Sequence, residues 1–90
     1  MLTKKEKEII IQCAKKYNVS AILLFGSLVK KKRASDIDLA VKGIEPSLFF
    51  KFYTELFKNL SKPVDLVDLD EQDTYFVKRI LEGGKIIYES

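Results

Sequence analysis

The chain has 90 residues, a net charge of +3, 47% hydrophobic residues and 32% charged residues. This length and composition predict one folded globular domain, residues 1–90, and exclude an intrinsically disordered chain. The sequence has no histidine and a single cysteine, which excludes Ser-His-Asp and Cys-His catalysis, zinc sites built from imidazoles or several thiolates, and an internal disulfide. Any bound metal is therefore expected to be a hard cation held by oxygen atoms.

The sequence also indicates where the protein acts. No apolar run reaches the roughly 18 residues that a membrane-spanning helix needs. The opening segment MLTKKEKE lacks the apolar core of a signal peptide. Together with the lone Cys13, these features predict a cytoplasmic protein without a membrane partner.

The first half of the chain alternates between helical and extended patterns. A helix is expected to begin at a capping box formed by Thr3 and Glu6 and to stop near Asn18. An apolar strand follows over residues 20–25. A brief helix is then expected to start at Ser27 and to fade into the basic run that follows it.

The pattern continues with a second strand over residues 36–42, which Gly43 ends. Pro46 is placed for the first turn of a helix whose apolar stripe spans residues 48–60. A third strand is expected over residues 64–69.

The last predicted unit is again a helix followed by a strand. Asp70 and Asp73 are expected to cap the helix, and Gly83 to end it in a left-handed conformation before a strand over residues 86–89. The whole alternation predicts an α/β (α+β) fold, in which a small mixed sheet of about four strands is packed by about four helices.

Two carboxylates interrupt the second predicted strand. Asp36 and Asp38 lie on one face of that strand, about 6–7 Å apart, because side chains alternate between the faces. Like charges this close repel one another unless a cation lies between them. Asp65 completes a three-carboxylate cluster if the third strand neighbours the second, and such oxygen ligands suit Mg²⁺ or Mn²⁺. The alternative is that these side chains are solvated at a sheet edge, which is the commoner meaning of an isolated D-x-D pattern.

The Gly26-Ser27 pair follows the first predicted strand. Glycine permits a positive φ or a close backbone approach, and a serine that opens a helix offers a hydroxyl and backbone N–H groups to an anion. The alternative is that Ser27 is an ordinary helix N-cap. Because the pair lies just before the D-x-D segment, it predicts a phosphate cradle beside the carboxylates, although the P-loop pattern is absent.

A basic run, Lys30 to Arg33, lies between these two motifs. It is either a solvated loop or a segment that attracts a triphosphate, RNA or an acidic partner surface. Nucleic acid is not the favoured ligand, because the positive charge is local and the aspartates repel phosphate in the absence of metal.

These motifs resemble those of the minimal nucleotidyltransferase (MNT) family, which belongs to the DNA polymerase β-like nucleotidyltransferase superfamily. The resemblance extends from about Ser20 to the end of the chain. The stretches that carry it are Gly26-Ser27, Asp36-Ile37-Asp38-Leu39, Pro63-Val64-Asp65-Leu66-Val67 and the segment from Glu82 to Glu89.

The resemblance implies two Mg²⁺ ions and transfer of a nucleoside monophosphate, AMP from ATP in the first instance, to an acceptor hydroxyl. Asp36, Asp38 and Asp65 would be the metal ligands and catalytic residues. The residues that would bind the nucleotide are Gly26, Ser27, Lys30 and Arg33.

The resemblance also implies a partner, since MNT proteins commonly act as antitoxins of HEPN-domain toxins, and some adenylylate a tyrosine of the toxin. A chain this short has no second domain to select a base or an acceptor, so a protein partner or self-association would supply that surface. The spacer between Gly-Ser and D-x-D is eight residues, shorter than is common in the family, and reads Leu28-Val29-Lys30-Lys31 where Ala-Arg-Gly is usual. This departure favours the alternative of a catalytically weak antitoxin that neutralises its HEPN partner by direct contact.

Overall fold

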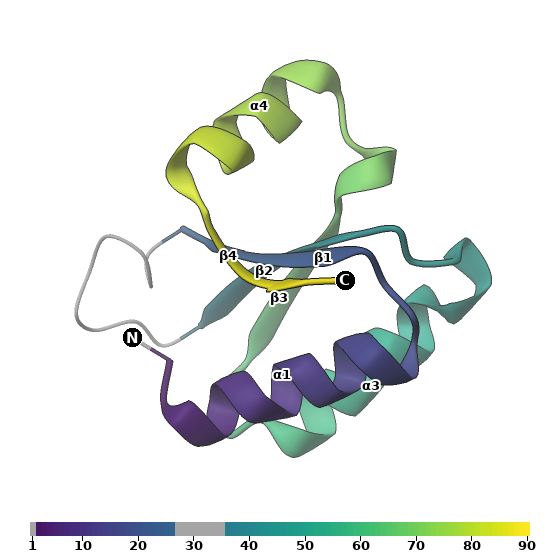
Figure 1. Cartoon of the computed structure of the whole chain (residues 1–90), viewed down its shortest axis with the longest axis vertical. Coiled ribbons are helices and arrows are strands. Elements are labelled where there is room, and N and C mark those ends of the chain that lie inside the picture. Colours follow the sequence, from purple (N-terminus) through teal and green to yellow (C-terminus); the bar gives the residue numbers. More distant parts are fainter. Residues whose placement is uncertain (1, 27–35) are drawn as a thin grey trace.

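The computed structural model describes residues 2–26 and 36–90, which form a sheet with helices on both faces (Figure 1). The strands are β1 (Ala21–Phe25), β2 (Ile37–Lys42), β3 (Val64–Asp68) and β4 (Lys85–Glu89). The helices are α1 (Lys4–Lys16), α3 (Phe49–Asn59) and α4 (Thr74–Gly83), with 3-10 turns at Pro46–Leu48 and Leu69–Glu71.

The sheet is mixed, with the strand order β3-β2-β1-β4. β1 pairs antiparallel with both β2 and β4, whereas β2 pairs parallel with β3. The parallel pair is connected through α3, as a parallel connection requires. This arrangement confirms the predicted α/β fold class. Three α-helices lie in the described part of the chain, and the brief helix predicted at Ser27 lies outside it.

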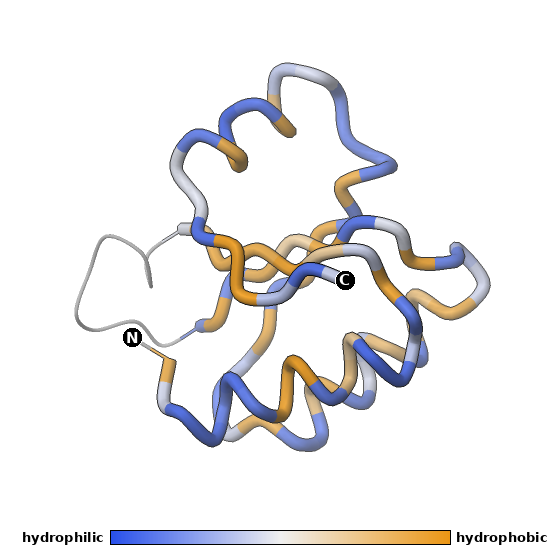
Figure 2. Tube along the Cα trace, in the orientation of Figure 1, coloured by the Kyte–Doolittle hydropathy of each residue, from blue (hydrophilic) through white to orange (hydrophobic). Residues whose placement is uncertain are grey.

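The main core lies between the sheet and the pair α1 and α3. Ile37, Leu39 and Val41 of β2 are fully buried there, against Phe52 and Leu56 of α3. The strands consist mainly of hydrophobic residues, whereas the helices alternate between hydrophobic and hydrophilic residues (Figure 2). The smaller core on the opposite face joins α4 to the sheet. Its buried residues are Leu23, Ala40, Leu69 and Ile80.

Local signals fix the first helix as predicted. The Thr3 side chain accepts a hydrogen bond from the Glu6 backbone N–H at 3.1 Å, and the Glu6 carboxylate accepts one from the Thr3 N–H at 2.9 Å. This is the predicted capping box. Asn18 adopts a left-handed conformation with φ 57°, which turns the chain out of α1 toward β1. No helix in the described ranges is long and apolar enough to cross a membrane.

The predicted left-handed cap at Gly83 is wrong. Gly83 is the last residue of α4, and the following Gly84 has extended backbone with φ −92° and ψ 168°. The chain passes directly from α4 into β4, and a Cβ on Gly84 would lie 2.6 Å from the Ile80 carbonyl oxygen and 3.1 Å from that of Leu24. Close packing against two backbones therefore requires glycine here, rather than a positive φ.

Two further helix starts differ in detail from prediction. Pro46 begins a 3-10 turn, and α3 itself starts at Phe49. Asp73 alone caps α4, by accepting a hydrogen bond from the Phe76 N–H at 2.8 Å. The Asp70 carboxylate instead accepts one from the Gly43 N–H at 2.9 Å, which ties the end of β2 to the turn that follows β3.

Glu55 joins α3 to α1. Its carboxylate accepts hydrogen bonds from the Lys16 ammonium at 2.7 Å, the Tyr17 hydroxyl at 3.2 Å and the Cys13 thiol at 3.6 Å. The bond from Lys16 holds the pKa of Glu55 below its ordinary value. Burial, reinforced by the negative charge of Glu55, raises the pKa of Cys13 to about 11. The ionised form of Glu55 is thus the one that the fold stabilises.

Glu55→Gln is expected to lower the melting temperature by about 2–4 °C near neutral pH, because the amide loses the ion pair with Lys16. A lowered pKa stabilises the fold above the unfolded-state pKa, and this contribution is lost as the pH falls through the folded-state pKa. The difference between wild type and variant should therefore shrink in acid, which thermal unfolding by circular dichroism would measure. A difference that persists at acid pH contradicts this assignment.

Candidate active site

Asp38 and Asp65, two of the three candidate carboxylates, lie on the face of the sheet that carries α4. Ile37, Leu39 and Val41 face the main core, so the alternating Asp38 and Ala40 point to the opposite side, as predicted. Ala40 is buried beneath α4, whereas Asp38, two residues earlier, is half-buried. On this face of β2, the small core under α4 therefore includes Ala40 and stops short of Asp38.

Asp38 and Asp65 are neighbours across the parallel pair β2–β3. The register places the Cα atoms of these two residues opposite one another, and adjacent strands lie about 4.8 Å apart. Because in-register residues of neighbouring strands share a face, both carboxylates lie on the α4 side. Asp65 is exposed at the outer strand, and Asp38 lies one strand further in. The condition set by the sequence, that the third strand neighbours the second, is therefore met.

Asp36 occupies a different kind of position. It lies in a bend immediately before β2 and is exposed. Across residues 2–26 and 36–90, no group of three or more His, Cys, Asp or Glu side chains is arranged to hold a metal ion. The structure thus brings Asp38 and Asp65 together, while the three-carboxylate cluster that includes Asp36 stays a prediction.

Gly26 lies directly against the Asp38 carboxylate. It follows β1 with φ +75°, beside the residue pair Phe25 and Asp38. A Cβ on Gly26 would lie 3.0 Å from the Asp38 carboxylate carbon and nearer still to one of its oxygens. Both reasons for expecting glycine here, a positive φ and a close approach, are therefore present. Gly26, the first residue of the predicted phosphate-binding segment, therefore lies beside Asp38, a predicted metal ligand.

This donor set fits a hard divalent cation. Mg²⁺ is bound through one or two carboxylates and takes its remaining ligands from water and substrate phosphates. Asp38 and Asp65 supply two carboxylates on neighbouring strands, and the missing side chain of Gly26 lets the Asp38 carboxylate lie against the backbone after β1. The pair is thus suited to a cation that arrives with a nucleotide.

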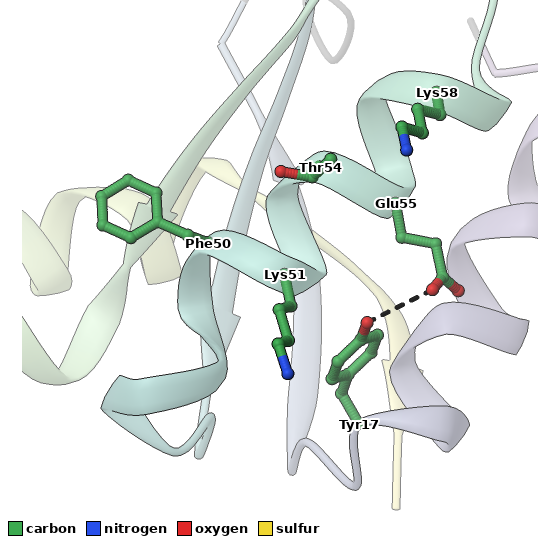
Figure 3. A pocket seen from close by; sticks show the side chains of 6 residues that line it. All are labelled: Tyr17, Phe50, Lys51, Thr54, Glu55 and Lys58. Carbon is green, nitrogen blue, oxygen red and sulfur yellow. Dashed lines mark hydrogen bonds between the residues drawn. The ribbon is translucent and has the colours of Figure 1, made fainter.

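The other predicted phosphate ligands, Ser27, Lys30 and Arg33, lie outside the described residues. A hollow of about 330 Å³ between α1 and α3 is lined by Tyr17, Glu55 and four neighbours on α3 (Figure 3). Figure 3 shows the Tyr17 hydroxyl directed at the Glu55 carboxylate. This hollow lies on the side of the sheet opposite to Asp38, so it is separate from the carboxylate pair.

A second hollow, of about 390 Å³, runs beside β3 and includes two residues that the sequence interpretation missed. Phe50 is 78% exposed although it belongs to the aromatic helix, and Glu71 lies in the turn after β3. Phe50 falls outside the helical stripe that continues through Phe52 and Leu56, and this position off the stripe is the sequence signal that its ring is exposed. No comparable signal marks Glu71.

Comparison with known families assigns the chain to one of them. The model of the family described as polymerase beta nucleotidyltransferase matches residues 7–90. The chain belongs to this family. The polymerase β nucleotidyltransferase assignment covers all four strands, and hence Gly26, Asp38 and Asp65. No curated protein sequence matches the chain.

Solved structures resemble this nucleotidyltransferase over most of its length. A toxin–antitoxin complex with AMP-PNP has a TM-score of 0.77 at 27% identity, covering 93% of this chain and 73% of the other. The toxin–antitoxin MntA-HepT gives 0.75 at 25% identity, covering 98% and 74%. A complex of tri-AMPylated Shewanella oneidensis HEPN toxin with MNT antitoxin has a TM-score of 0.74 at 27% identity, covering 94% of this chain and 71% of the other. The antitoxin resemblance inferred from the motifs thus extends to the fold.

Proposed function

We propose that this protein is a Mg²⁺-dependent nucleotidyltransferase that moves AMP from ATP to a hydroxyl of a HEPN-type toxin, a tyrosine in the first instance, and so acts as its antitoxin. The observation that carries the proposal is the Asp38–Asp65 pair, with Gly26 packed against Asp38, in a chain of the polymerase β nucleotidyltransferase family. A single domain, residues 1–90, and a cytoplasmic location belong to the same proposal.

The acceptor and the nucleotide are supported by the similar structures. One contains AMP-PNP, and another contains an AMPylated HEPN toxin together with its MNT antitoxin. Their similarity to this chain extends over 93% and 94% of its residues, which supports the same overall domain in this chain. The same chemistry in this chain would need the same kind of partner.

The chemistry requires the acceptor oxygen to form a bond with the α-phosphorus of ATP while the bond to the β-phosphate breaks and pyrophosphate leaves. Asp38, with Asp36, would hold the metal–nucleotide complex, and Asp65 would take up the hydroxyl proton. When bound, Mg²⁺ would neutralise negative charge on the phosphates. Gly26 and Ser27 would offer backbone N–H groups to the leaving phosphates, with Lys30 and Arg33 nearby in sequence.

Label position tests this proposal. The chain is incubated with Mg²⁺ and a HEPN-domain protein encoded next to its gene, using ATP labelled at either the α- or the γ-phosphate. AMP transfer places the α-label on the partner, leaves the γ-label in pyrophosphate, and requires both proteins. Transfer of the γ-label would indicate phosphorylation, and no transfer at all would contradict the proposal.

The contact-only antitoxin is the second candidate. Two observations favour it: no three-ligand group for a metal lies in the described part of the chain, and Asp36 stands outside β2. A stable complex that neutralises the toxin and shows no label transfer, with or without Mg²⁺, would establish this alternative.

A further inference from the structure

The hollow beside β3 follows the edge of the strand. Leu66 packs toward the main core and Val67 toward the smaller core under α4, so the two side chains lie on opposite faces. Both line the same hollow, together with Asp68. A hollow lined from both faces runs along the strand's outer edge. Phe50 at the start of α3 and Glu71 after β3 also line it.

The backbone of β3 is available along this edge. β3 is the terminal strand of the sheet formed by the described residues, with β2 on its other side. The Ile37 N–H donates to the Pro63 carbonyl at 2.8 Å, which directs the peptide groups of residue 63, and by alternation those of residues 65 and 67, toward β2. The peptide groups of Val64 and Leu66 therefore point outward. An edge that pairs with no other strand among residues 2–26 and 36–90 is a template for an additional strand.

The charge and shape of the edge indicate what it accepts. The charged residues that line the hollow are Asp68 and Glu71, although the chain as a whole has a net charge of +3. One oxygen of the Asp68 carboxylate accepts a hydrogen bond from the Asp70 N–H at 3.0 Å, whereas Glu71 is exposed. Phe50 adds a largely exposed aromatic ring to the same hollow. The edge thus complements an extended segment that carries positive and apolar side chains.

We propose that the outer edge of β3 binds a basic, extended segment of the acceptor protein as an added strand. Asp65 precedes Leu66 on this strand, and side chains of directly opposite residues on neighbouring strands lie about 4.5–5.5 Å apart at their Cβ atoms. A tyrosine of the added segment is thereby held beside the Asp65 carboxylate. This rests on the proposed function only for the statement that the bound segment is the acceptor.

Binding is tested without nucleotide, so that AMP transfer plays no part in the result. The probe is a fluorescein-labelled peptide that carries one tyrosine among lysines and threonines, and its counterpart has glutamates in place of the lysines. Fluorescence anisotropy is expected to show binding of the basic peptide and at least about tenfold weaker binding of the acidic one. Equal binding of the two peptides, or no binding of either, overturns the proposal.

Two matched pairs of variants locate the site. Glu71→Lys and Phe50→Ala are each expected to weaken binding of the basic peptide by about tenfold. Glu82→Lys changes an exposed carboxylate on α4, and Phe57→Ala removes a 53% exposed ring from the same helix as Phe50, so both should leave binding unchanged. If the variants and their controls lose peptide binding equally, the loss comes from the change in net charge or surface hydrophobicity and not from the β3 edge, which overturns the proposal.

Hydrogen exchange tests the added strand itself. The Leu66 amide points outward and is expected to become protected when the basic peptide binds, whereas the Asp65 amide, directed at β2, should change little. Binding without protection of Leu66 overturns strand addition. If peptide binding and protection are observed but no AMP is transferred to any partner, the edge site stands and the proposed function fails. If AMP is transferred to the partner at a rate that Glu71→Lys and Phe50→Ala do not change, the proposed function stands and the β3 edge is not the acceptor site.

Discussion

Asp38→Asn is expected to reduce AMP transfer by about 10²–10³-fold, because it removes the negative charge that would hold the metal–nucleotide complex and keeps the size of the side chain. Asp38 is the inner member of the carboxylate pair, and Gly26 packs directly against it. Initial rates of α-label transfer at saturating partner measure the effect. Asp65→Asn should cause a loss of similar size, and the double variant should lose little more than either, because the two carboxylates act as one unit.

The matched control is Glu82→Gln, which neutralises an exposed carboxylate on α4. It should transfer AMP at the wild-type rate. A readout independent of catalysis is the rise in melting temperature caused by Mg²⁺ with a nonhydrolysable ATP analogue, which binding to the folded state produces in the wild type and which Asp38→Asn should abolish. An Asp38→Asn protein that keeps both the transfer rate and the Mg²⁺-dependent stabilisation would remove Asp38 from the site.

Gly26→Ala is expected to damage both stability and activity. An L-residue at φ +75° is destabilised by about 1–2 kcal/mol, and the new methyl group would overlap the Asp38 carboxylate. The carboxylate must then move, and a displacement of about 1 Å is enough to lower the rate by about 10²-fold. Urea unfolding and the rate of α-label transfer per folded molecule measure the two effects separately.

Gly43→Ala is the matched control for this change. Gly43 also has a positive φ, +78°, and its Cβ would lie 2.8 Å from the Cβ of Ser20, which precedes β1. A similar loss of stability is therefore expected, without displacement of Asp38 and without loss of activity per folded molecule. If the two alanine variants lose activity equally, the effect of Gly26 is on folding alone.

The sequence predicts those parts of the fold that depend on local physics. The capping box of Thr3 and Glu6, the alternating faces of β2 and the positive φ of Gly26 each follow from neighbouring residues, and each is present. The pairing of Asp38 with Asp65 was conditional on the strand order, which a hydrophobic pattern does not contain. The carboxylate pair could therefore be named in advance, but its register could not.

The misjudged positions share a physical cause. The left-handed cap predicted at Gly83 follows the general preference of helix ends, but the tight passage from α4 into β4 moves the essential glycine to Gly84, where two carbonyl oxygens leave no room for a Cβ. Asp70, predicted to cap α4, instead accepts a hydrogen bond from the N–H of Gly43, the residue that follows β2. In each case a contact between segments distant in sequence overrides a local preference.

The parallel register of β2 and β3 has a consequence for how the protein becomes active. Asp38 and Asp65 are separated by 27 positions, and α3 lies between their strands, whereas β1 and β2 pair directly as antiparallel neighbours. Bringing the two carboxylates together therefore requires closure of a long connection, whose entropic cost is offset only after α3 packs on the sheet. A partly folded chain with an intact β1–β2 pair would lack the juxtaposed acids. Activity is thus expected only once the tertiary structure is complete. A chain in which α3 is detached from the sheet would lack activity even where the β1–β2 pair persists.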